Sequence, residues 1–366
     1  MLPSMNSKKK FILFSKSYWN ETKRIRHQVA NLLVDNGHQV IFFEKPDFLI
    51  SSSLKKIRST DTRTIDVRRT KQLIHHQLRI FSFLRWLNAK YEKISISKKI
   101  DFKRDLNSVI INFNYDYYFL RDIFKYNKII TIINDDFVAQ SKINKGKHAL
   151  QVLEITCKNS DAVFVVSYPL ARQVENWCDP KILLPWSQSK YTKPTNNIKR
   201  KSILIWAHID TRINFELIIE VAIKKPELSI DIYGPISTKV LKEIHILKKS
   251  FDQIKFCGTA ELLEINFKKY FCTILPYKMN DKPISAVTAA NKTFQLLSMG
   301  LPIVTHGMRE FIENKAIFKT YNKKNFIKAI DTCFAEFYNL QTHIKNLVNQ
   351  HQPKDRYNKI MSVINN

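Results

Sequence analysis

One stretch of the sequence limits the possible folds more than any other, Phe271–His306. Two strand-like apolar runs, FCTILPY and LPIVTH, enclose a segment with helical spacing. That spacing predicts a helix over about Ala289–Met299, with Thr288 placed to cap its start and Gly300 placed to end it. Because a strand, a helix and a second strand follow one another, the stretch indicates a β-α-β unit of a parallel sheet.

The same alternation of apolar runs and helical segments extends over most of the chain. The runs with strand character are KFILFS, HQVIFFEKP, SVIINFN, KIITII and SDAVFVVS in the first half, and SILIWAHI, SIDIYG and IKFCG in the second. The first run is followed by a predicted helix that starts near Glu21. A segment over about Leu262–Tyr270 is predicted as a helix that leads into FCTILPY. We therefore predict an α/β protein with two Rossmann-like domains and a cleft between them.

The domain boundaries follow from the polar segment at 187–201, which contains proline, lacks periodicity and is predicted to be a linker. A chain of 366 residues is also long for a single core. We predict one Rossmann-like domain over residues 1–190 and a second one over 191–345. Residues 346–366 are predicted to form a helical tail that packs back on the first domain.

The segment Thr70–Glu92 is predicted to be one helix, preceded by a polar, basic loop over 51–69. Its apolar positions follow helical spacing, and additional aromatic side chains widen the stripe between flanking arginines. Two interpretations remain open for this helix. It lies on an anionic bilayer, or it packs against its own sheet with a solvated basic side.

The net charge of +28 favours an anionic partner, such as a nucleic acid, an acidic membrane surface or a phosphorylated substrate. No RNA- or DNA-binding motif accompanies the charge, so surface attraction is favoured over base reading. The five cysteines are never in CxxC spacing, and neither a zinc site nor a disulfide framework is indicated. No apolar run has the length of a membrane span. We expect a cytoplasmic protein, with the inner face of the membrane as its anionic surface.

Lys292 and Gln295 are candidate ligand-binding residues because they lie three residues apart at the start of the predicted helix. Free N–H groups, the positive end of the helix dipole and a nearby ammonium group favour a diphosphate at such a position. The Ser285–Thr288 loop leads into the same helix start. The alternative is a buried β-α-β unit with Lys292 in solvent.

Asp135 and Asp136 are candidate catalytic residues because they follow directly after the predicted strand KIITII. Catalytic residues of α/β folds gather at the carboxyl ends of strands, where a carboxylate can accept the proton of an attacking hydroxyl group. The alternative for one of the two is to cap the next helix.

The loop after the first strand lacks the GxGxxG fingerprint, so the first domain is not expected to hold a dinucleotide. Its side chains Ser17, Trp19, Arg24 and His27 are candidates for the cleft. The alternative is that Trp19 packs internally and the charged residues are solvated.

In order along the chain, these motifs resemble GT-B glycosyltransferases, and in particular the bacterial glucuronosyltransferases of xanthan assembly with the related capsule and teichuronic-acid transferases. The resemblance rests on GHQVIFFEKP, NDDF, SDAVFVVS, LLPW, HID, YGP, LPY and NKTFQLLSMGLPIVT. It implies that Tyr277 contacts the donor nucleotide, Lys292 the diphosphate or sugar, and Gln295 the ribose, with His208, Ser285, Thr288 and Asn291 as further donor-binding residues. It also implies that Asp136 or Asp135 is the base, supported by Glu154.

The resemblance implies transfer of a sugar, such as glucuronic acid, from a UDP-linked donor to a saccharide or polyprenyl-diphosphate-linked acceptor in bacterial surface polysaccharide synthesis. Val287 and Gln295 stand where the large retaining GT-B family has its two glutamates, so an inverting reaction is expected. No metal ion and no cofactor is expected. The alternatives are a basic nucleic-acid-binding protein and a non-catalytic nucleotide-sugar-binding scaffold.

Overall fold

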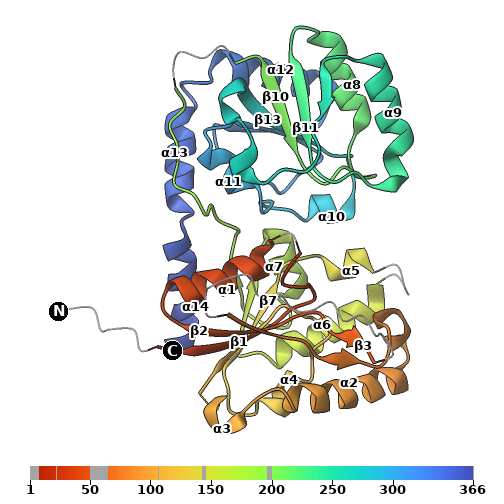
Figure 1. The fold of residues 1–366 in the computed structure, drawn as a ribbon, viewed down its shortest axis with the longest axis vertical. Helices are drawn as coiled ribbons and strands as arrows, with labels where there is room; N and C mark the ends of the chain where they lie inside the picture. The colour runs from red at the N-terminus through yellow and green to blue at the C-terminus, as the bar shows by residue number, and fades with distance from the viewer. Residues whose placement is uncertain are drawn as a thin grey trace, which may run out of the picture. The chain divides into compact units, whose positions relative to one another are not determined.

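The computed structural model describes residues 8–21, 23–49, 65–105, 107–141, 146–195 and 200–365. The chain divides into two compact units (Figure 1). Unit 1 consists of Met1–Leu183 together with Tyr357–Asn366, and unit 2 of Leu184–Arg356. The predicted tail is therefore shared between the units, since its last part belongs to unit 1.

Unit 1 is built on a seven-stranded parallel sheet in the order β4-β2-β1-β6-β7-β8-β9. The strands in this order are β4 (Ile65–Arg68), β2 (Gln39–Phe43), β1 (Lys10–Phe14), β6 (Val109–Asn112), β7 (Ile129–Ile133), β8 (Ala162–Val165) and β9 (Pro180–Ile182). Every residue of β6 and β7 is buried. Their mainly apolar sequences follow from this, because a central parallel strand has helices over both faces.

The helices of unit 1 are α1 (Ile25–Asp35), α2 (Ser82–Ser97), α3 (Phe102–Asp105), α4 (Leu120–Ile123), α5 (Phe137–Gln140), α6 (Lys147–Lys158) and α7 (Tyr168–Val174). Helix α14 (Pro353–Asn365) returns to this unit, where the Tyr357 hydroxyl and His38 Nε2 are 2.7 Å apart. Its side chains Ile360, Met361 and Val363 are buried.

Unit 2 has a six-stranded parallel sheet in the order β12-β11-β10-β13-β14-β15. The strands in this order are β12 (Ile254–Phe256), β11 (Ser229–Tyr233), β10 (Ser202–Trp206), β13 (Tyr270–Pro276), β14 (Ile303–His306) and β15 (Ile317–Thr320). The helices are α8 (Phe215–Lys224), α9 (Leu241–Ser250), α10 (Lys282–Ser285), α11 (Thr293–Ser298), α12 (Lys323–Ala335) and α13 (Gln341–Gln350). Both sheets confirm the predicted α/β class with two Rossmann-like domains.

The predicted helix over Ala289–Met299 is wrong in its start, because α11 begins at Thr293 with Lys292 as its N-cap. Thr288 does not cap it. Thr288 is fully buried and lies in the loop between α10 and α11. Its carbonyl oxygen accepts the Ile312 N–H at 2.8 Å, so it does not take part in a helical hydrogen bond. The end is as predicted, since Gly300 has a φ of +77° directly after the C-cap. A Cβ there would lie 2.6 Å from Pro194 Cγ.

The single helix predicted over Thr70–Glu92 is also wrong. The segment contains β5 (Lys71–Gln72), which pairs with β3 (Asp47–Phe48), then a 3₁₀ helix η1 (His76–Ile80), and only then α2. The Asn88 side chain stabilises the non-helical segment after β5, because its Oδ1 accepts the backbone N–H groups of Leu73 and Ile74 at 3.1 and 3.0 Å. In the preceding predicted loop, β4 occupies Ile65–Arg68 and residues 51–64 lie outside the described part.

Two smaller predictions also change. The first helix begins at Ile25, after the predicted start at Glu21. The helix predicted over Leu262–Tyr270 is replaced by two single 3₁₀ turns, η4 (Leu262–Glu264) and η5 (Phe267–Lys269). Asn266 separates them, since its side chain accepts the Lys268 N–H at 3.2 Å and so competes with helical hydrogen bonding.

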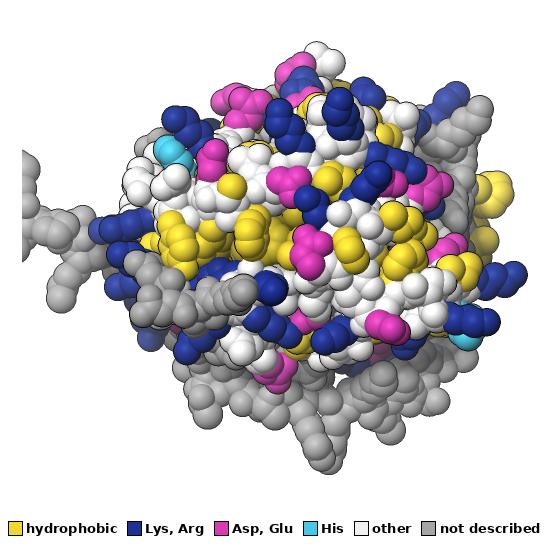
Figure 2. Space-filling model, turned by 90° about the horizontal axis from the view of Figure 1, so that it is seen from above, with side chains coloured by type: hydrophobic (Ala, Val, Ile, Leu, Met, Phe, Trp, Pro, Cys, Tyr) yellow, Lys and Arg dark blue, Asp and Glu magenta, His cyan; other side chains and the backbone are white. Residues whose placement is uncertain are grey.

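The basic charge is distributed over the surface. On the face drawn in Figure 2, Lys and Arg side chains lie in many places, with Asp and Glu side chains among them and hydrophobic side chains between. A nucleic-acid groove would gather cations along one track. The face shown has no such track.

Candidate functional site

The carboxyl edge of the unit 2 sheet has a topological switch point between β10 and β13. From β10 the chain passes to β11 on one side, and β13 and β14 lie on the other side. Ligands of open α/β sheets bind in the crevice outside the strands at such a point. The residues just beyond β10 and β13 are therefore the first place to search for a binding site in this unit.

Backbone contacts join the two strand ends at this edge. The N–H of Asn214 donates to the Pro276 carbonyl at 2.7 Å, and the N–H of Lys278 donates to the Arg212 carbonyl at 2.9 Å. Gly234, just after β11, allows the close approach of the chain, because a Cβ there would lie 1.7 Å from the Ala207 carbonyl oxygen. The segments that follow β10 and β13 thus form one connected edge.

Lys292 lies at this edge with its ammonium group over an aromatic ring. Its Nζ is 4.1 Å from the centroid of the Trp206 ring, and Trp206 is the last residue of β10. The indole N–H donates to the Ala260 carbonyl at 3.2 Å and so fixes the ring. Burial lowers the pKa of Lys292 to about 8, against the opposing charge of Glu261. In the described part of the chain, no ion pair joins Lys292 to a carboxylate.

Arg212 and Asp210 form a fork-like ion pair beside this lysine-bearing edge. Arg212 Nη2 is 2.7 Å from Asp210 Oδ2, and Arg212 Nε is 3.0 Å from both carboxylate oxygens. Burial of Asp210 opposes ionisation, but the bonds from Arg212 outweigh it and lower the pKa of the carboxyl group. His208 is half exposed, with its Nε2 3.9 Å from Asp210 Oδ2. Asp210 thus orients two nitrogen-bearing side chains toward solvent at the edge.

The structure assembles some of the predicted donor-binding residues and separates others. Tyr277 follows β13, and its carbonyl oxygen accepts the His306 Nδ1–H at 2.7 Å, while burial raises the pKa of its hydroxyl group. Gln295 lies in the first turn of α11. Ser285 ends the separate helix α10, and Asn291 lies in the loop between the two helices. Thr288 is fully buried, with its carbonyl group directed to Ile312.

The structure divides the two predicted catalytic aspartates by role. Asp136 is the N-cap of α5, where its Oδ1 accepts the Ala139 N–H at 2.8 Å and lies 3.4 Å from Gln173 Nε2. Asp135 is partly exposed just beyond β7, and its carboxylate accepts from Gln140 Nε2 at 3.1 Å. Capping, the alternative for one of the pair, therefore falls to Asp136. Glu154, on α6, forms an ion pair with Lys158 one turn later.

The four predicted cleft residues are mostly held by contacts within unit 1. Trp19 packs against His27 and Phe42, with ring centroids 5.3 and 4.9 Å apart. His27 is fully buried, accepts the Arg24 N–H at Nδ1 and donates from Nε2 to the Tyr18 carbonyl, both at 3.1 Å. Burial lowers its pKa to about 4, so this ring is neutral at physiological pH. Ser17 is buried, and only Arg24 is exposed.

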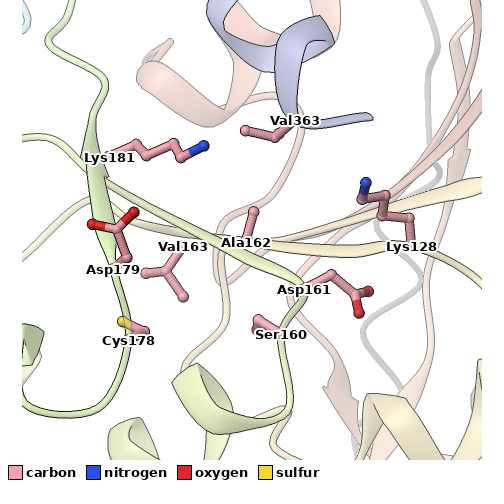
Figure 3. A pocket seen from close by; sticks show the side chains of 9 residues that line it. All are labelled: Lys128, Ser160, Asp161, Ala162, Val163, Cys178, Asp179, Lys181 and Val363. Atoms are coloured by element: carbon pink, nitrogen blue, oxygen red, sulfur yellow. The ribbon is translucent and has the colours of Figure 1, made fainter. Parts of the chain in front are cut away.

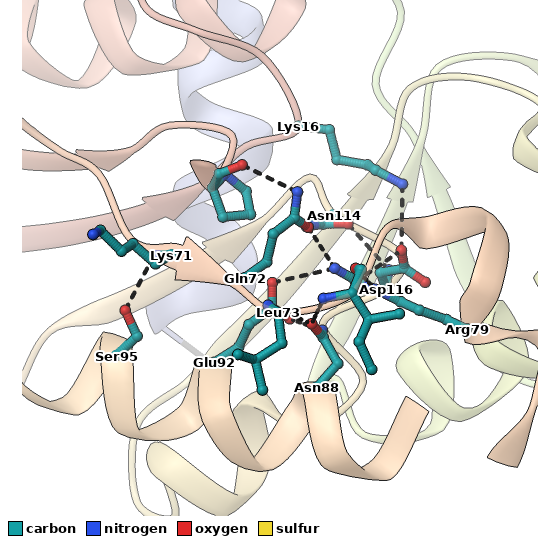
Figure 4. A network of polar contacts seen from close by, with 12 residues as sticks. Lys16, Lys71, Gln72, Leu73, Arg79, Asn88, Glu92, Ser95, Asn114 and Asp116 are labelled. Atoms are coloured by element: carbon teal, nitrogen blue, oxygen red, sulfur yellow. Dashed lines mark hydrogen bonds and ion pairs between the residues drawn. The ribbon is translucent and has the colours of Figure 1, made fainter. Parts of the chain in front are cut away.

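Sequence reasoning missed a polar network at the switch point of unit 1, which lies between β1 and β6 (Figure 4). Lys16 Nζ is 3.6 Å from Asp116 Oδ2 and 4.0 Å from the Tyr115 ring centroid. Arg79 is 3.4 Å from Asp116 and 3.5 Å from Glu92. Burial raises the pKa of Glu92 to about 7, although Arg79 opposes this. A sequence signal existed, because Asp116 follows the strand SVIIN much as Asp135 follows KIITII.

A cavity of about 340 Å³ lies at the opposite edge of the unit 1 sheet (Figure 3). Lys128 and Asp161, which line it, directly precede β7 and β8, so it borders the amino ends of the strands. Asp161 Oδ2 accepts the Ile129 N–H at 2.7 Å and also pairs with Arg121. These contacts give Asp161 a structural role, and the carboxyl edges remain the better candidates for binding.

The described residues show neither a cluster of metal ligands nor a membrane-spanning helix. Within the described residues, no three His, Cys, Asp or Glu side chains are grouped closely enough to hold a metal ion. Within the same residues, no helix combines the length and hydrophobicity needed to cross a bilayer.

Solved structures share this fold over almost the entire chain. Anabaena HepE in complex with UDP superposes with a TM-score of 0.68 and 10% identity, covering 98% of this chain and 99% of that one. The apo form of the lipopolysaccharide outer core galactosyltransferase WaaB gives a TM-score of 0.64 and 12% identity, with coverage of 97% and 99%. A glycosyltransferase from Rickettsia africae gives 0.62 and 14%, with 98% of both chains covered.

These similarities show that the chain has the GT-B fold. No protein-family model and no curated protein sequence matches the chain. The finer resemblance to glucuronosyltransferases stays a prediction.

Proposed function

We propose that the chain is a glycosyltransferase that moves a sugar from a nucleotide-sugar donor to an acceptor. The fold supports this proposal, because structures that match it over nearly their full length carry glycosyltransferase names or hold UDP. A fold alone does not fix an activity, so the proposal needs support from a site in this chain.

The observation that carries the proposal is the position of Lys292 over Trp206 at the carboxyl edge of unit 2. Departure of a nucleoside diphosphate develops negative charge, which a fixed cation in a partly dehydrated site stabilises. The Trp206 ring holds the ammonium without neutralising it, so its charge remains available to a phosphate. His208 and Arg212 supply further donors at the same edge. A UDP-linked donor fits this arrangement, with Tyr277 near the nucleotide and Gln295 near the ribose.

On the acceptor side, we assign the role of base to Asp135. Both carboxylates are half-buried beyond the carboxyl end of β7, and Asp136 already accepts a backbone N–H as a helix cap. An ionised carboxylate at this position would take the proton from an acceptor hydroxyl as the sugar is transferred. Glu154 is assigned a supporting role. The reaction is proposed to be inverting and to need no metal ion. In this proposal, the ammonium group of Lys292 stabilises the charge of the leaving diphosphate.

The proposed acceptor is a saccharide, free or linked to polyprenyl diphosphate, in the synthesis of a bacterial surface polysaccharide. The donor sugar is proposed to be glucuronic acid, whose carboxylate suits the lysines Lys278 and Lys282 that follow β13. A lipid-linked acceptor lies at a membrane surface. We therefore propose that the protein works in the cytoplasm on the anionic inner face of the membrane.

Thermal-shift screening against a panel of nucleotide sugars, followed by a donor hydrolysis and transfer assay, tests the function. Stabilisation by UDP-sugars and release of UDP in the presence of an acceptor are expected. Stabilisation without any turnover would favour the scaffold alternative. Binding of RNA with a steep salt dependence, and no stabilisation by any nucleotide sugar, would favour the nucleic-acid alternative.

A further inference from the structure

Helix α2 buries two polar residues beside Ala89 and Ile96, and it exposes two large aromatic residues. Asn88 and Glu92 are buried on its inner side. Phe83 and Trp86 point outward, with 66% and 56% of their surface exposed. An ordinary helix buries its large apolar residues and exposes its polar ones. Among the described residues of unit 1, no other element covers these two aromatic side chains.

Hydrogen bonds on the inner side hold the helix in this orientation (Figure 4). Asn88 Oδ1 accepts two backbone N–H groups, and its Nδ2 donates to Glu92 Oε2 at 2.9 Å. Arg79 lies 3.5 Å from the same carboxylate. Rotating α2 to bury Phe83 and Trp86 would expose this network and leave its partners unpaired, at a large cost. The outward position of the aromatic side chains is thus a fixed property of the fold.

The exposed surface continues beyond α2 into the preceding 3₁₀ helix. We refer to it as the α2 stripe, which consists of six exposed apolar residues: Leu78, Phe81, Phe83, Trp86, Leu87 and Ile94. The Phe83 and Trp86 rings are stacked with centroids 6.1 Å apart. A gathering of large exposed apolar side chains on one helix and the turn before it is typical of an interaction site.

The charges around the α2 stripe select the partner. Between residues 85 and 99 there are five cationic side chains, Arg85, Lys90, Lys93, Lys98 and Lys99, and one acidic side chain, the buried Glu92. Lys93 forms an ion pair with Asp122 at 2.9 Å, so the cations remain in excess. Lys90 Nζ lies 5.4 Å from the Trp86 ring centroid, so cations border the aromatic surface directly. Aromatic side chains flanked by lysines suit the boundary between anionic headgroups and acyl chains. A second copy of the chain would bring like charges together across a two-fold interface.

We propose that the α2 stripe docks the protein on an anionic lipid bilayer, with α2 lying in the plane of the interface. Phe83 and Trp86 enter the acyl boundary, and the surrounding lysines contact anionic headgroups. This inference does not require sugar transfer, because docking is measured without donor or acceptor. Docking of this kind would bring the protein to the membrane, where a lipid-linked acceptor lies.

Sedimentation of the full-length protein with vesicles tests the proposal, using phosphatidylcholine alone and phosphatidylcholine with about one third phosphatidylglycerol. We expect binding to the anionic vesicles only. The double variant Phe83→Ser, Trp86→Ser should lower the affinity at least tenfold, because the buried apolar area is lost. The matched control is Ile223→Ser, Ile246→Ser, since these side chains are similarly exposed on α8 and α9 of unit 2. It should bind as the unchanged protein does.

A second pair of changes separates charge from hydrophobic contact. Lys98→Gln with Lys99→Gln should weaken binding by an order of magnitude or more, because each cation near an anionic surface contributes about fivefold. Circular dichroism and the Tm establish that each variant is folded. Failure of the unchanged protein to bind anionic vesicles would overturn the proposal. So would a dimer, measured by light scattering, that Phe83→Ser with Trp86→Ser converts to a monomer while vesicle binding persists.

Discussion

The switch points of the two sheets have similar topology and different electrostatics. In unit 2, between β10 and β13, Lys292 rests on the Trp206 ring. In unit 1, between β1 and β6, Lys16 and Arg79 lie within 3.6 Å of Asp116, so cations and carboxylates largely neutralise one another. The first edge is suited to an anion and the second to an uncharged group. The two proposed ligands differ in the same property, because a donor diphosphate is an anion and an acceptor hydroxyl group is uncharged.

Removal of the proposed base of unit 1 should have the largest effect on catalysis. Asp135→Asn should lower kcat by roughly 10²–10⁴-fold, because general base catalysis contributes an effect of this size. Donor affinity should change less than about twofold, since the donor edge is intact. Steady-state kinetics and donor titration measure the two effects.

Asp136→Asn is the matched control for that experiment, because Asp136 caps α5. It should cost about 1 kcal/mol or less of stability and retain most of the turnover. A result in which Asp136→Asn abolishes turnover and Asp135→Asn does not would reverse the assignment.

The next largest expected effect is a loss of stability when the polar network of unit 1 is broken. Arg79→Ala removes the cation from two carboxylates, Asp116 and Glu92, that remain buried. Breaking a buried ion pair on one side costs about 3–5 kcal/mol, so the free energy of unfolding should fall by about that amount. Urea denaturation measures it. A loss below about 1 kcal/mol would mean that the network contributes little to the fold.

Glu92 gives unit 1 a predicted pH dependence. Burial raises its pKa in the folded protein to about 7, from an ordinary value of 4.5. Between these values the unfolded chain loses its proton while the folded protein keeps it, so stability falls as the pH rises from 4.5 to 7. The loss amounts to about 3 kcal/mol and is complete above pH 7.

Unfolding free energies of the unchanged protein and of Glu92→Gln, measured across this pH range, isolate the contribution of the glutamate. Glutamine does not titrate, so the difference between the two proteins should change by about the predicted amount. Parallel pH profiles would show that Glu92 keeps an ordinary pKa in the folded state.

The sequence predicts the strands of this fold better than its helices. Strands such as Ile129–Ile133 are buried on both faces, so they are mainly apolar and their positions can be predicted from sequence. The start of helix α2 was predicted wrongly because polar residues lie on its inner face. The hydrogen bonds of Asn88 that fix the segment before the helix involve residues 14 and 15 positions earlier in the chain. An amphipathic pattern alone gives no sign of such an arrangement.

The candidate site shows the same limit. Lys292 was found from its place in a local β-α-β pattern, but the Trp206 ring that holds it belongs to a strand far earlier in the chain. The network of Lys16, Arg79 and Asp116 likewise joins three distant segments. Contacts of this kind depend on sheet order, which the sequence pattern does not specify. The local pattern did identify the Asp135–Asp136 pair, and only the structure showed that Asp136 is the one that caps a helix.

The most direct test of the central claim is a calorimetric titration of a UDP-sugar into the unchanged protein, Lys292→Met and Lys268→Met. Lys268 is an exposed lysine that precedes β13 and so lies toward the opposite edge of the same sheet. At pH 7, Lys292→Met should weaken binding by roughly 10–100-fold, since a charge-assisted contact to phosphate is lost. Lys268→Met should bind normally.

The unchanged protein should also lose roughly tenfold in affinity between pH 7 and pH 9, because the pKa of Lys292 is about 8 and only the protonated form attracts the diphosphate. Lys292→Met should show no such loss. Equal affinities for all three proteins at pH 7, with no dependence on pH up to 9, would contradict the account.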